Sequence, residues 1–341
     1  MKIRRIALTL AGAAVLALGG GLVALRAGAG ASDRAEIEKR WADGPSRFVM
    51  VDGVRMHVRE EGPKDGPVVV LLHGSIVNLH EWDGVAPLLA DKYRVVRFDW
   101  SPYGLTGPDP SGVYSTPRSA QLMDGLMRAL GHDKFALVAT SNGSNVGLEY
   151  NRAYPGHVTA MAFSMLPLER PSQTRKVDWR LRWMLATHKA VLPDWRAKAF
   201  WRIMLNDTTP PAFEPTDRMV DQIYDMNNLP GALQRQAEYI QANVKAFKTS
   251  DVGAVAQSVR VPVLLQWCSY DDVISQSAQA SVKRFTNTKV DLIEYPDLGH
   301  FPMWENPEKF TRDLRSWLER QEAAVPKAPV ADRVSPPSGR V

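Results

Sequence analysis

The chain has 341 residues, of which 45% are hydrophobic and 23% charged, a composition that excludes a disordered protein and allows a sizeable core. Its net charge is +5, but the first 26 residues hold four basic and no acidic residues, so the remainder carries only +1. That balance disfavours a nucleic-acid surface, and the single cysteine, Cys268, excludes a disulfide framework and a multi-cysteine metal site.

The N-terminal segment, residues 1–32, has three basic residues among its first five, followed by an uncharged stretch from Ile6 to Leu25. As a helix this stretch is about 30 Å long, enough to cross the hydrocarbon core of a bilayer. The small residues at 29–31 would also suit a signal-peptidase cut, so the sequence predicts either a membrane anchor or a cleaved signal. The rest of the chain is then expected on the exported side, periplasmic or extracellular, either held to the membrane by this segment or secreted after cleavage.

Short runs rich in aliphatic and β-branched residues recur along the middle of the chain. The first two predict a hairpin around Asp52-Gly53, and helical patterns separate most of the others. Unbroken apolar strands that alternate with helices predict a largely parallel sheet with helices on both faces. The predicted strands are 47–51, 54–59, 68–72, 93–98, 135–139, 158–165, 261–267 and 290–295.

The alternation stops between residues 169 and 253, where amphipathic helical patterns occur without a convincing strand. Because strands resume afterwards, this part is predicted to be a helical cap inserted into a loop of one core, which comprises residues 33–168 and 254–321. The last helix is expected to begin at Pro307, after an N-cap at residue 306. Residues 322–341 are rich in Pro, Ala and charge, which predicts a disordered tail.

A serine that could act as a nucleophile follows the predicted strand 135–139. Ser141 lies at a sharp strand-to-helix turn, with the small residues Ala139 and Gly143 two positions before and after it. Such a turn exposes the serine hydroxyl, and the free N–H groups of the following helix favour negative charge beside it.

A serine hydroxyl needs a base, and the base needs a carboxylate to orient it. The loop after strand 290–295 supplies His300, and the loop after strand 261–267 supplies Asp271. Asp272 and Glu169 are rival carboxylates near the same predicted edge of the sheet. The carboxyl ends of parallel strands meet at one edge, so these side chains are expected to converge there.

Five local motifs together make the sequence resemble the α/β-hydrolases. The motifs are Leu71-Leu72-His73-Gly74-Ser75, the loop from Asp99 to Thr106, the serine turn, the acid loop, and Gly299-His300-Phe301-Pro302 with Glu305-Asn306-Pro307. The resemblance covers roughly residues 46–320 and implies an eight-stranded, mostly parallel sheet with a helical cap between strands six and seven. It is closest to the capped branch, which includes esterases, carbon–carbon bond hydrolases, epoxide hydrolases and haloalkane dehalogenases.

The resemblance also implies roles for individual residues. Ser141 would attack a carbonyl, His300 would take and return the proton, and Asp271 would hold the imidazolium. The backbone N–H groups of Ser75 and Asn142 would bind the oxyanion.

Other residues near these motifs are expected to support the site. His73 is expected to shape the oxyanion turn by packing and hydrogen bonding. Trp82, Trp267 and Trp304 lie beside the motif loops and predict an apolar pocket for an acyl or aromatic group.

The predicted function is hydrolysis of a carboxylic ester or lactone by an acyl-enzyme mechanism, acting on a small molecule without a cofactor or a metal ion. Family members that open epoxides or remove halide use aspartate at the turn, whereas this chain has Ser141. Cleavage of a carbon–carbon bond with the same three residues remains an alternative. A catalytically inactive binding module at the membrane is another, because Ala139 and Ser144 replace glycines that the family usually has.

Overall fold

The computed structural model of the chain describes residues 19–21, 23–24, 31–169 and 175–324. The predicted membrane anchor or signal, residues 1–32, lies mostly outside the described residues, as does most of the predicted tail, residues 322–341. Within the described ranges, no helix is both long enough and apolar enough to cross a bilayer.

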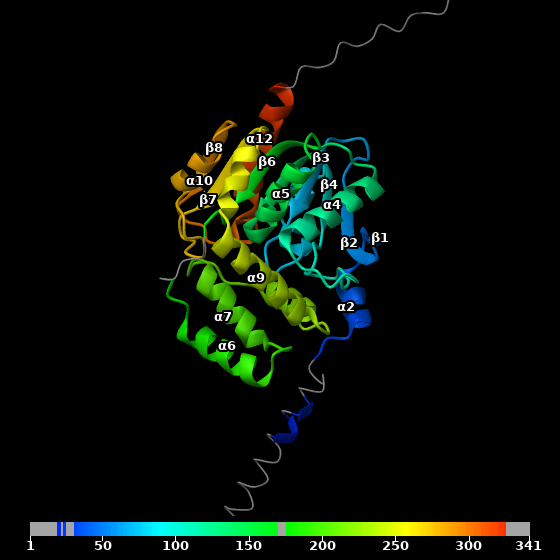
Figure 1. The fold of residues 1–341 in the computed structure, drawn as a ribbon, viewed down its shortest axis with the longest axis vertical. Helices are drawn as coiled ribbons and strands as arrows, with labels where there is room; N and C mark the ends of the chain where they lie inside the picture. Colours follow the sequence, from blue (N-terminus) through cyan, green and yellow to red (C-terminus); the bar gives the residue numbers. More distant parts are fainter. Residues whose placement is uncertain (1–18, 22, 25–30, 170–174, 325–341) are drawn as a thin grey trace, which may run out of the picture.

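An eight-stranded sheet forms the centre of the molecule (Figure 1). Its strands are β1 (Ser46–Val51), β2 (Val54–Glu61), β3 (Val68–Leu72), β4 (Arg94–Phe98), β5 (Phe135–Thr140), β6 (Val158–Ser164), β7 (Val263–Cys268) and β8 (Val290–Tyr295). The order across the sheet is β1-β2-β4-β3-β5-β6-β7-β8. Only the pairs β1–β2 and β2–β4 are antiparallel, which confirms the predicted, mostly parallel sheet.

Each central strand supplies side chains to two hydrophobic cores, one on each face of the sheet. In β3, Val70 and Leu72 pack on one face, and Val69 and Leu71 pack on the other. All four side chains are at most 1% exposed. Burial on both faces explains why this run is apolar at every position.

Helices cover both faces of the sheet. On one face lie α4 (Thr116–Leu130) and α5 (Ser141–Ala153), whose apolar residues join the core that contains Val70. On the other lie α3 (Ala86–Leu89) and α12 (Pro307–Ala324), whose apolar residues join the second core. The sheet is therefore a middle layer between two layers of helices.

The final helix starts where the sequence predicts. The side chain of Asn306 accepts a hydrogen bond from the backbone N–H of Lys309 at 3.0 Å, and Pro307 is the first helical residue. The helix ends at Ala324, so the first three residues of the predicted tail are helical. The remaining residues of that tail lie outside the described part of the chain.

Between β6 and β7, the described residues form four helices in the part of the sequence predicted as a cap, and we call them the cap helices. They are α6 (Trp179–Val191), α7 (Lys198–Thr208), α8 (Asp217–Asn227) and α9 (Ala232–Thr249), and the short helix η2 (Val252–Ser258) follows them. In Figure 1, α6, α7 and α9 lie together at one end of the sheet. Buried residues of this segment, such as Trp201 and Ile223, belong to the same core as α12, so the cap helices pack onto the sheet domain.

The remaining short helices position the loops around the sheet. They are α2 (Arg34–Trp41), η1 (Leu79–Trp82), α10 (Ala278–Arg284) and α11 (Pro302–Glu305). The helix α2 lies against the cap helix α8, where the indole N–H of Trp41 donates to the carboxylate of Asp225 at 2.8 Å. Through this contact the start of the folded chain is held to the cap helices.

Candidate active site

Ser141 occupies a strained turn between β5 and α5. Its φ angle is +48°, in the left-handed region that side chains other than glycine rarely adopt. Two residues later, only glycine fits, because a Cβ on Gly143 would lie 2.3 Å from the carbonyl oxygen of His73. Ser141 begins α5, where the first N–H groups have no partner inside the helix and favour an anion.

The loop after β3 lies directly against this turn. A Cβ placed on Gly74 would lie 3.3 Å from the Cβ of Ser141. The ring nitrogen Nδ1 of His73 is 2.7 Å from the carbonyl oxygen of Gly74, and Nε2 accepts a hydrogen bond from the backbone N–H of Trp100 at 3.3 Å. His73 therefore donates from Nδ1. Burial lowers its pKa to about 4, so the ring stays neutral.

This contact fixes the orientation of the next peptide group. The carbonyl and N–H of a trans peptide point in opposite directions, so holding the Gly74 carbonyl aims the N–H of Ser75 away from His73. The role expected for His73, shaping the turn by hydrogen bonding, is what this geometry supports. Ser75 is partly exposed, whereas His73 is fully buried.

A buried carboxyl group that sequence analysis missed also contacts this loop. Glu81 lies in η1, is 1% exposed, and accepts the backbone N–H of Gly74 at 2.9 Å. Burial raises the pKa of Glu81 to about 8, against the opposing effects of the Gly74 N–H and of His300. Because Glu81 occupies the N–H of Gly74, the next N–H available in this loop is that of Ser75. A single glutamate in a polar stretch gives no sequence signal of this kind.

His300 and Asp271 are in direct contact. Nδ1 of His300 is 2.6 Å from Oδ2 of Asp271, whose side chain is fully buried. The other carboxylate oxygen of Asp271 accepts the backbone N–H of Val273, which fixes its orientation. Nε2 of His300 has no hydrogen-bond partner among the described residues, which leaves that nitrogen available to accept a proton.

The two rival carboxylates are paired with arginines instead. Asp272 is bound by Arg175 at 2.7 Å, and its side chain is 58% exposed. Glu169 is paired with Arg284 at 3.7 Å. Of the three acids considered from the sequence, Asp271 is the one that contacts His300.

Three carboxyl groups influence the protonation of His300. Burial lowers the pKa of His300, but the carboxylate of Asp271, followed by Glu81 and Glu305, outweighs burial and raises it above the usual value. Glu305 accepts the backbone N–H groups of Gly299 and Phe301 at 2.6 and 3.0 Å, so it holds the chain on both sides of the imidazole.

The loop that carries His300 is also bound to the cap helices. The backbone N–H of His300 donates to the carbonyl of Thr208, the last residue of α7, at 3.0 Å. A Cβ on Gly299 would lie 2.9 Å from the same carbonyl oxygen, so this close approach requires glycine. The histidine loop is thus bound directly to the end of α7.

A cavity of about 150 Å³ opens beside Ser141. Its apolar wall comes mainly from α9 and from the loop after Asp271, and its polar lining residues come from several segments. Two of the α9 residues, Ile240 and Val244, are also 46% and 41% exposed, so the apolar wall continues to the surface. The lining residues are Ser141, Asn142, Pro167, Glu169, Ile240, Asn243, Val244, Phe247, Val273, Ile274, Ser275 and Gln276. Sequence analysis did not identify the residues of α9.

The three tryptophans expected to bind substrate do not line this cavity. Trp82 is fully buried and packs near Phe310, with the ring centroids 6.2 Å apart. Trp304 stacks on Phe301 at 5.1 Å, and Trp267 is 6% exposed within the same core. All three belong to the buried hydrophobic core instead. The expectation was wrong because proximity in sequence to a motif does not determine which way a side chain faces.

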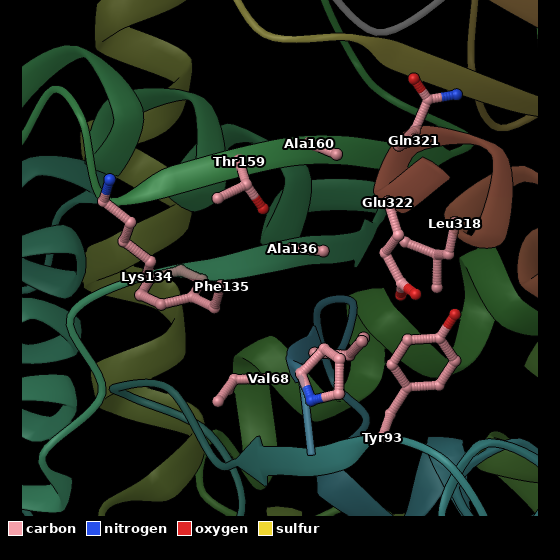
Figure 2. A pocket seen from close by; sticks show the side chains of 12 residues that line it. Val68, Tyr93, Lys134, Phe135, Ala136, Thr159, Ala160, Leu318, Gln321 and Glu322 are labelled. Carbon is pink, nitrogen blue, oxygen red and sulfur yellow. The ribbon is translucent and has the colours of Figure 1, made fainter. Parts of the chain in front are cut away.

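A second cavity, of about 290 Å³, lies where β3, β5 and β6 begin, beside the last turns of α12. Figure 2 shows Val68, Ala136 and Ala160 among the strand residues that line it, together with Tyr93 and with Glu322 of α12. None of the residues predicted to carry out chemistry lines it. The larger of these two cavities is therefore at the end of the sheet away from Ser141.

Comparison with protein families gives one match that covers most of the fold. The model described as "alpha/beta hydrolase fold" matches residues 67–307. A protein named probable oxidoreductase EphD, from Mycobacterium tuberculosis, is 28% identical over 315 residues, covering 84% of this chain. That match covers 52% of the relative, so this chain spans about half the length of the curated relative.

Solved structures give the same fold. A thermophilic esterase from Thermogutta terrifontis has a TM-score of 0.64 at 20% identity, covering 81% of this chain and 98% of the esterase. A bacterial membrane phospholipase A has a TM-score of 0.66 at 21% identity, covering 95% of this chain and all of the phospholipase. At these identities the likeness establishes the fold alone.

Proposed function

The chain belongs to the alpha/beta hydrolase fold family, and from that premise we propose that it is a serine hydrolase that cleaves a carboxylic ester or lactone through an acyl-enzyme. The observation that carries the proposal is the 2.6 Å contact between His300 and Asp271, at the same edge of the sheet as the strained Ser141.

In the proposed mechanism, the hydroxyl of Ser141 attacks the substrate carbonyl while Nε2 of His300 accepts its proton. Asp271 orients the ring through Nδ1 and stabilises the imidazolium that forms. The carbonyl electron pair moves to oxygen, where the N–H groups of Ser75 and Asn142 would bind it. The imidazolium then protonates the leaving alcohol, and water attacks the acyl-enzyme by the same steps.

A serine nucleophile favours carbonyl chemistry over displacement at a saturated carbon. An aspartate that attacks an alkyl halide or an epoxide forms an ester, which water can hydrolyse. A serine that attacked the same carbon would form an ether, which water does not cleave under these conditions. Ser141 therefore supports ester hydrolysis rather than the dehalogenation or epoxide opening performed by aspartate-using members of the fold.

Substitution of the nucleophile tests this proposal. Ser141→Ala is expected to abolish turnover of a short 4-nitrophenyl ester without changing the melting temperature, because the side chain is small. A fluorophosphonate probe should label the wild-type protein at Ser141 and fail to label the variant. Wild-type protein that neither hydrolyses the ester nor reacts with the probe would indicate a binding module instead.

A vinylogous 1,5-diketone is the matched second substrate, because it reports cleavage of a carbon–carbon bond with the same three residues. Faster turnover of the diketone than of the ester by wild-type protein would favour the carbon–carbon hydrolase. Loss of both activities in Ser141→Ala would show that one site performs both reactions.

We also propose that the catalytic domain is exported, either on a membrane anchor or after cleavage of a signal. The support is the basic start of the chain followed by the uncharged stretch to Leu25. Mass spectrometry of the mature protein from membrane and soluble fractions distinguishes the two forms. A protein whose intact N-terminus is recovered only from the cytosol would contradict export.

A further inference from the structure

The side-chain hydroxyl of Ser75 has an unusual set of partners beside the proposed oxyanion site. Its oxygen accepts a hydrogen bond from the hydroxyl of Tyr103 at 3.0 Å and another from the side-chain amide of Asn142 at 2.9 Å. Among the residues that the structure describes, no acceptor receives the hydrogen of Ser75 itself. Both lone pairs of the oxygen are thus occupied, and the hydrogen remains to be donated.

The two donors to Ser75 are themselves held in place. Tyr103 is 1% exposed and packs edge-on against Trp100, with ring centroids 4.6 Å apart. Burial raises the pKa of Tyr103 well above its usual value, so its hydroxyl keeps its proton at physiological pH. A buried phenol in this position can therefore act as a constant donor to Ser75.

The second donor, Asn142, ends a chain of hydrogen bonds that runs from Thr116 on α4 through Asn243 on the cap helix α9. The hydroxyl of Thr116, which lies 3.2 Å from that of Tyr239, donates to Oδ1 of Asn243 at 3.3 Å. Nδ2 of Asn243 then donates to Oδ1 of Asn142 at 3.1 Å, and Nδ2 of Asn142 donates to Ser75. In each of these bonds the acceptor is nearer to Ser75 along the chain of bonds than the donor is. Consecutive hydrogen bonds that share one donor-to-acceptor direction polarise one another.

Ser75 also has the right place in the chain for a role in catalysis. It carries one of the two backbone N–H groups proposed to bind the oxyanion, and its hydroxyl contacts the side chain of Asn142, which carries the other. A Cβ on the adjacent Gly74 would lie 3.3 Å from the Cβ of Ser141, and Ser75 itself is partly exposed.

We propose that the hydroxyl of Ser75 is a third donor to the oxyanion, oriented by Tyr103 and by the Asn243–Asn142 chain. This inference rests on the proposed serine hydrolase function. In the tetrahedral intermediate, the new bond joins Oγ of Ser141 to the carbonyl carbon, and the former carbonyl electron pair resides on oxygen. The hydroxyl of Ser75 donates its hydrogen to that oxygen without transferring it, beside the two N–H groups.

The first test compares Ser75→Ala with Ser75→Thr, using hydrolysis of 4-nitrophenyl acetate by the full chain. Removing one oxyanion donor typically lowers kcat about 100-fold, so Ser75→Ala is expected to lose about that factor with KM changed little. Ser75→Thr keeps the hydroxyl and should recover most of the rate. The matched control is Ser281→Ala, a buried serine on α10 whose hydroxyl bonds the carbonyl of Ser277, and it should behave as wild type.

A second readout separates oxyanion binding from a structural role. A trifluoromethyl ketone labelled with ¹³C at the carbonyl forms a hemiketal with Ser141, and its chemical shift reports ionisation of the oxyanion. Loss of a donor in Ser75→Ala should raise the pKa of that hemiketal and weaken inhibition by the same factor as kcat/KM. Tyr103→Phe should have a smaller effect in the same direction, because it removes one of the two bonds that orient the hydroxyl.

The possible results are distinguishable. A Ser75→Ala enzyme with kcat within threefold of wild type, or with a higher KM and unchanged kcat, would overturn the role of Ser75 while leaving the hydrolase in place. An unchanged hemiketal pKa would overturn it as well. Wild-type protein without esterase activity and without reaction at Ser141 would overturn both the proposed function and this inference.

Discussion

The two cavities at opposite ends of the sheet differ in chemistry more than in size. The cavity at the start of β3, β5 and β6 has about 290 Å³, and the one beside Ser141 has about 150 Å³. The larger one is bordered by apolar strand residues and by side chains such as Lys134 and Glu322 at its rim. The smaller one is lined by the strained Ser141, at the edge of the sheet where the loops that carry Asp271 and His300 also lie.

This difference follows from the direction of the strands. In a parallel sheet, every βα turn and every following helix N-terminus lies at the carboxyl ends of the strands, where backbone N–H groups face outward. Helix C-termini lie at the amino ends instead. The last turns of α12, for example, lie beside Tyr93. Volume alone therefore does not identify a site; the convergence of buried polar groups does.

The largest effect is expected from a substitution that breaks the contact between His300 and Asp271. Asp271→Asn keeps the shape of the side chain but favours the wrong tautomer of His300. We expect kcat for a 4-nitrophenyl ester to fall roughly 10⁴-fold, with the folded state retained in circular dichroism. Asp272→Asn, on the neighbouring exposed acid, is the control and should remain active; equal losses in the two variants would contradict the assignment of Asp271.

The next effect comes from the backbone of the serine turn. In Gly143→Ala, the added Cβ would lie 2.3 Å from the carbonyl oxygen of His73, so the turn must shift. We expect a loss of about 2 kcal/mol in the free energy of unfolding, measured with urea, and at least a tenfold loss of kcat. Gly107→Ala is matched, because its Cβ would meet neighbours at 3.6 Å and φ is not positive there; it should change neither property strongly.

A smaller effect concerns pH. Because the pKa of His300 is raised, the neutral ring that accepts a proton is lost as pH falls through a value above 6.5, and kcat/KM should fall tenfold per pH unit below it. The free energy of unfolding has the opposite pH dependence. The contribution of the imidazolium to it is fully present below the unfolded pKa of about 6.5 and is lost as pH rises through the raised pKa.

Glu81→Gln sharpens this test. Because the pKa of Glu81 is raised to about 8, its carboxyl is mostly protonated through the acid limb of kcat/KM. Glutamine, which can still accept the N–H of Gly74, then replaces a neutral group and should leave this limb close to that of the wild type. Glu294→Gln, an exposed carboxylate on β8, should leave the limb in place. A shift of the acid limb to lower pH in Glu81→Gln would instead show that Glu81 is ionised beside His300 in that pH range.

The smallest effect is expected at the other end of the sheet. Ala136→Leu places a larger apolar side chain in the cavity of Figure 2, which has room for it. We expect kcat and KM within twofold of wild type, and a melting temperature changed by only a few degrees, because the cavity is filled without a clash. A large loss of activity would show that the two ends of the sheet are coupled.

Most of the fold and the three proposed catalytic residues could be predicted from the sequence. The strands that carry them are apolar at every position, so both their identity and their ends are visible. Ser141, Asp271 and His300 each follow directly after such a strand, and a parallel sheet brings those positions together.

The walls of the site could not be predicted in the same way. Ile240 and Val244 line the cavity because α9 crosses above the strand ends. The hydrophobic periodicity of a cap helix predicts that it is a helix, but not where it packs. Trp82 was expected at the substrate but is fully buried, because its position beside a motif does not specify its direction. Glu81 and Tyr103 became relevant only through contacts with a loop distant in sequence.

The bond between the backbone of His300 and Thr208 has a consequence for the modularity of the molecule. The cap helices and the proposed catalytic histidine are not separable parts, since the carbonyl at the end of α7 binds the backbone of the residue proposed to accept the proton. A chimera that received its insertion from another hydrolase would inherit a misplaced base unless it reproduced a carbonyl at that point and a glycine at position 299. An exchanged cap can therefore change the substrate range only if it keeps the hydrogen bond to the backbone of His300.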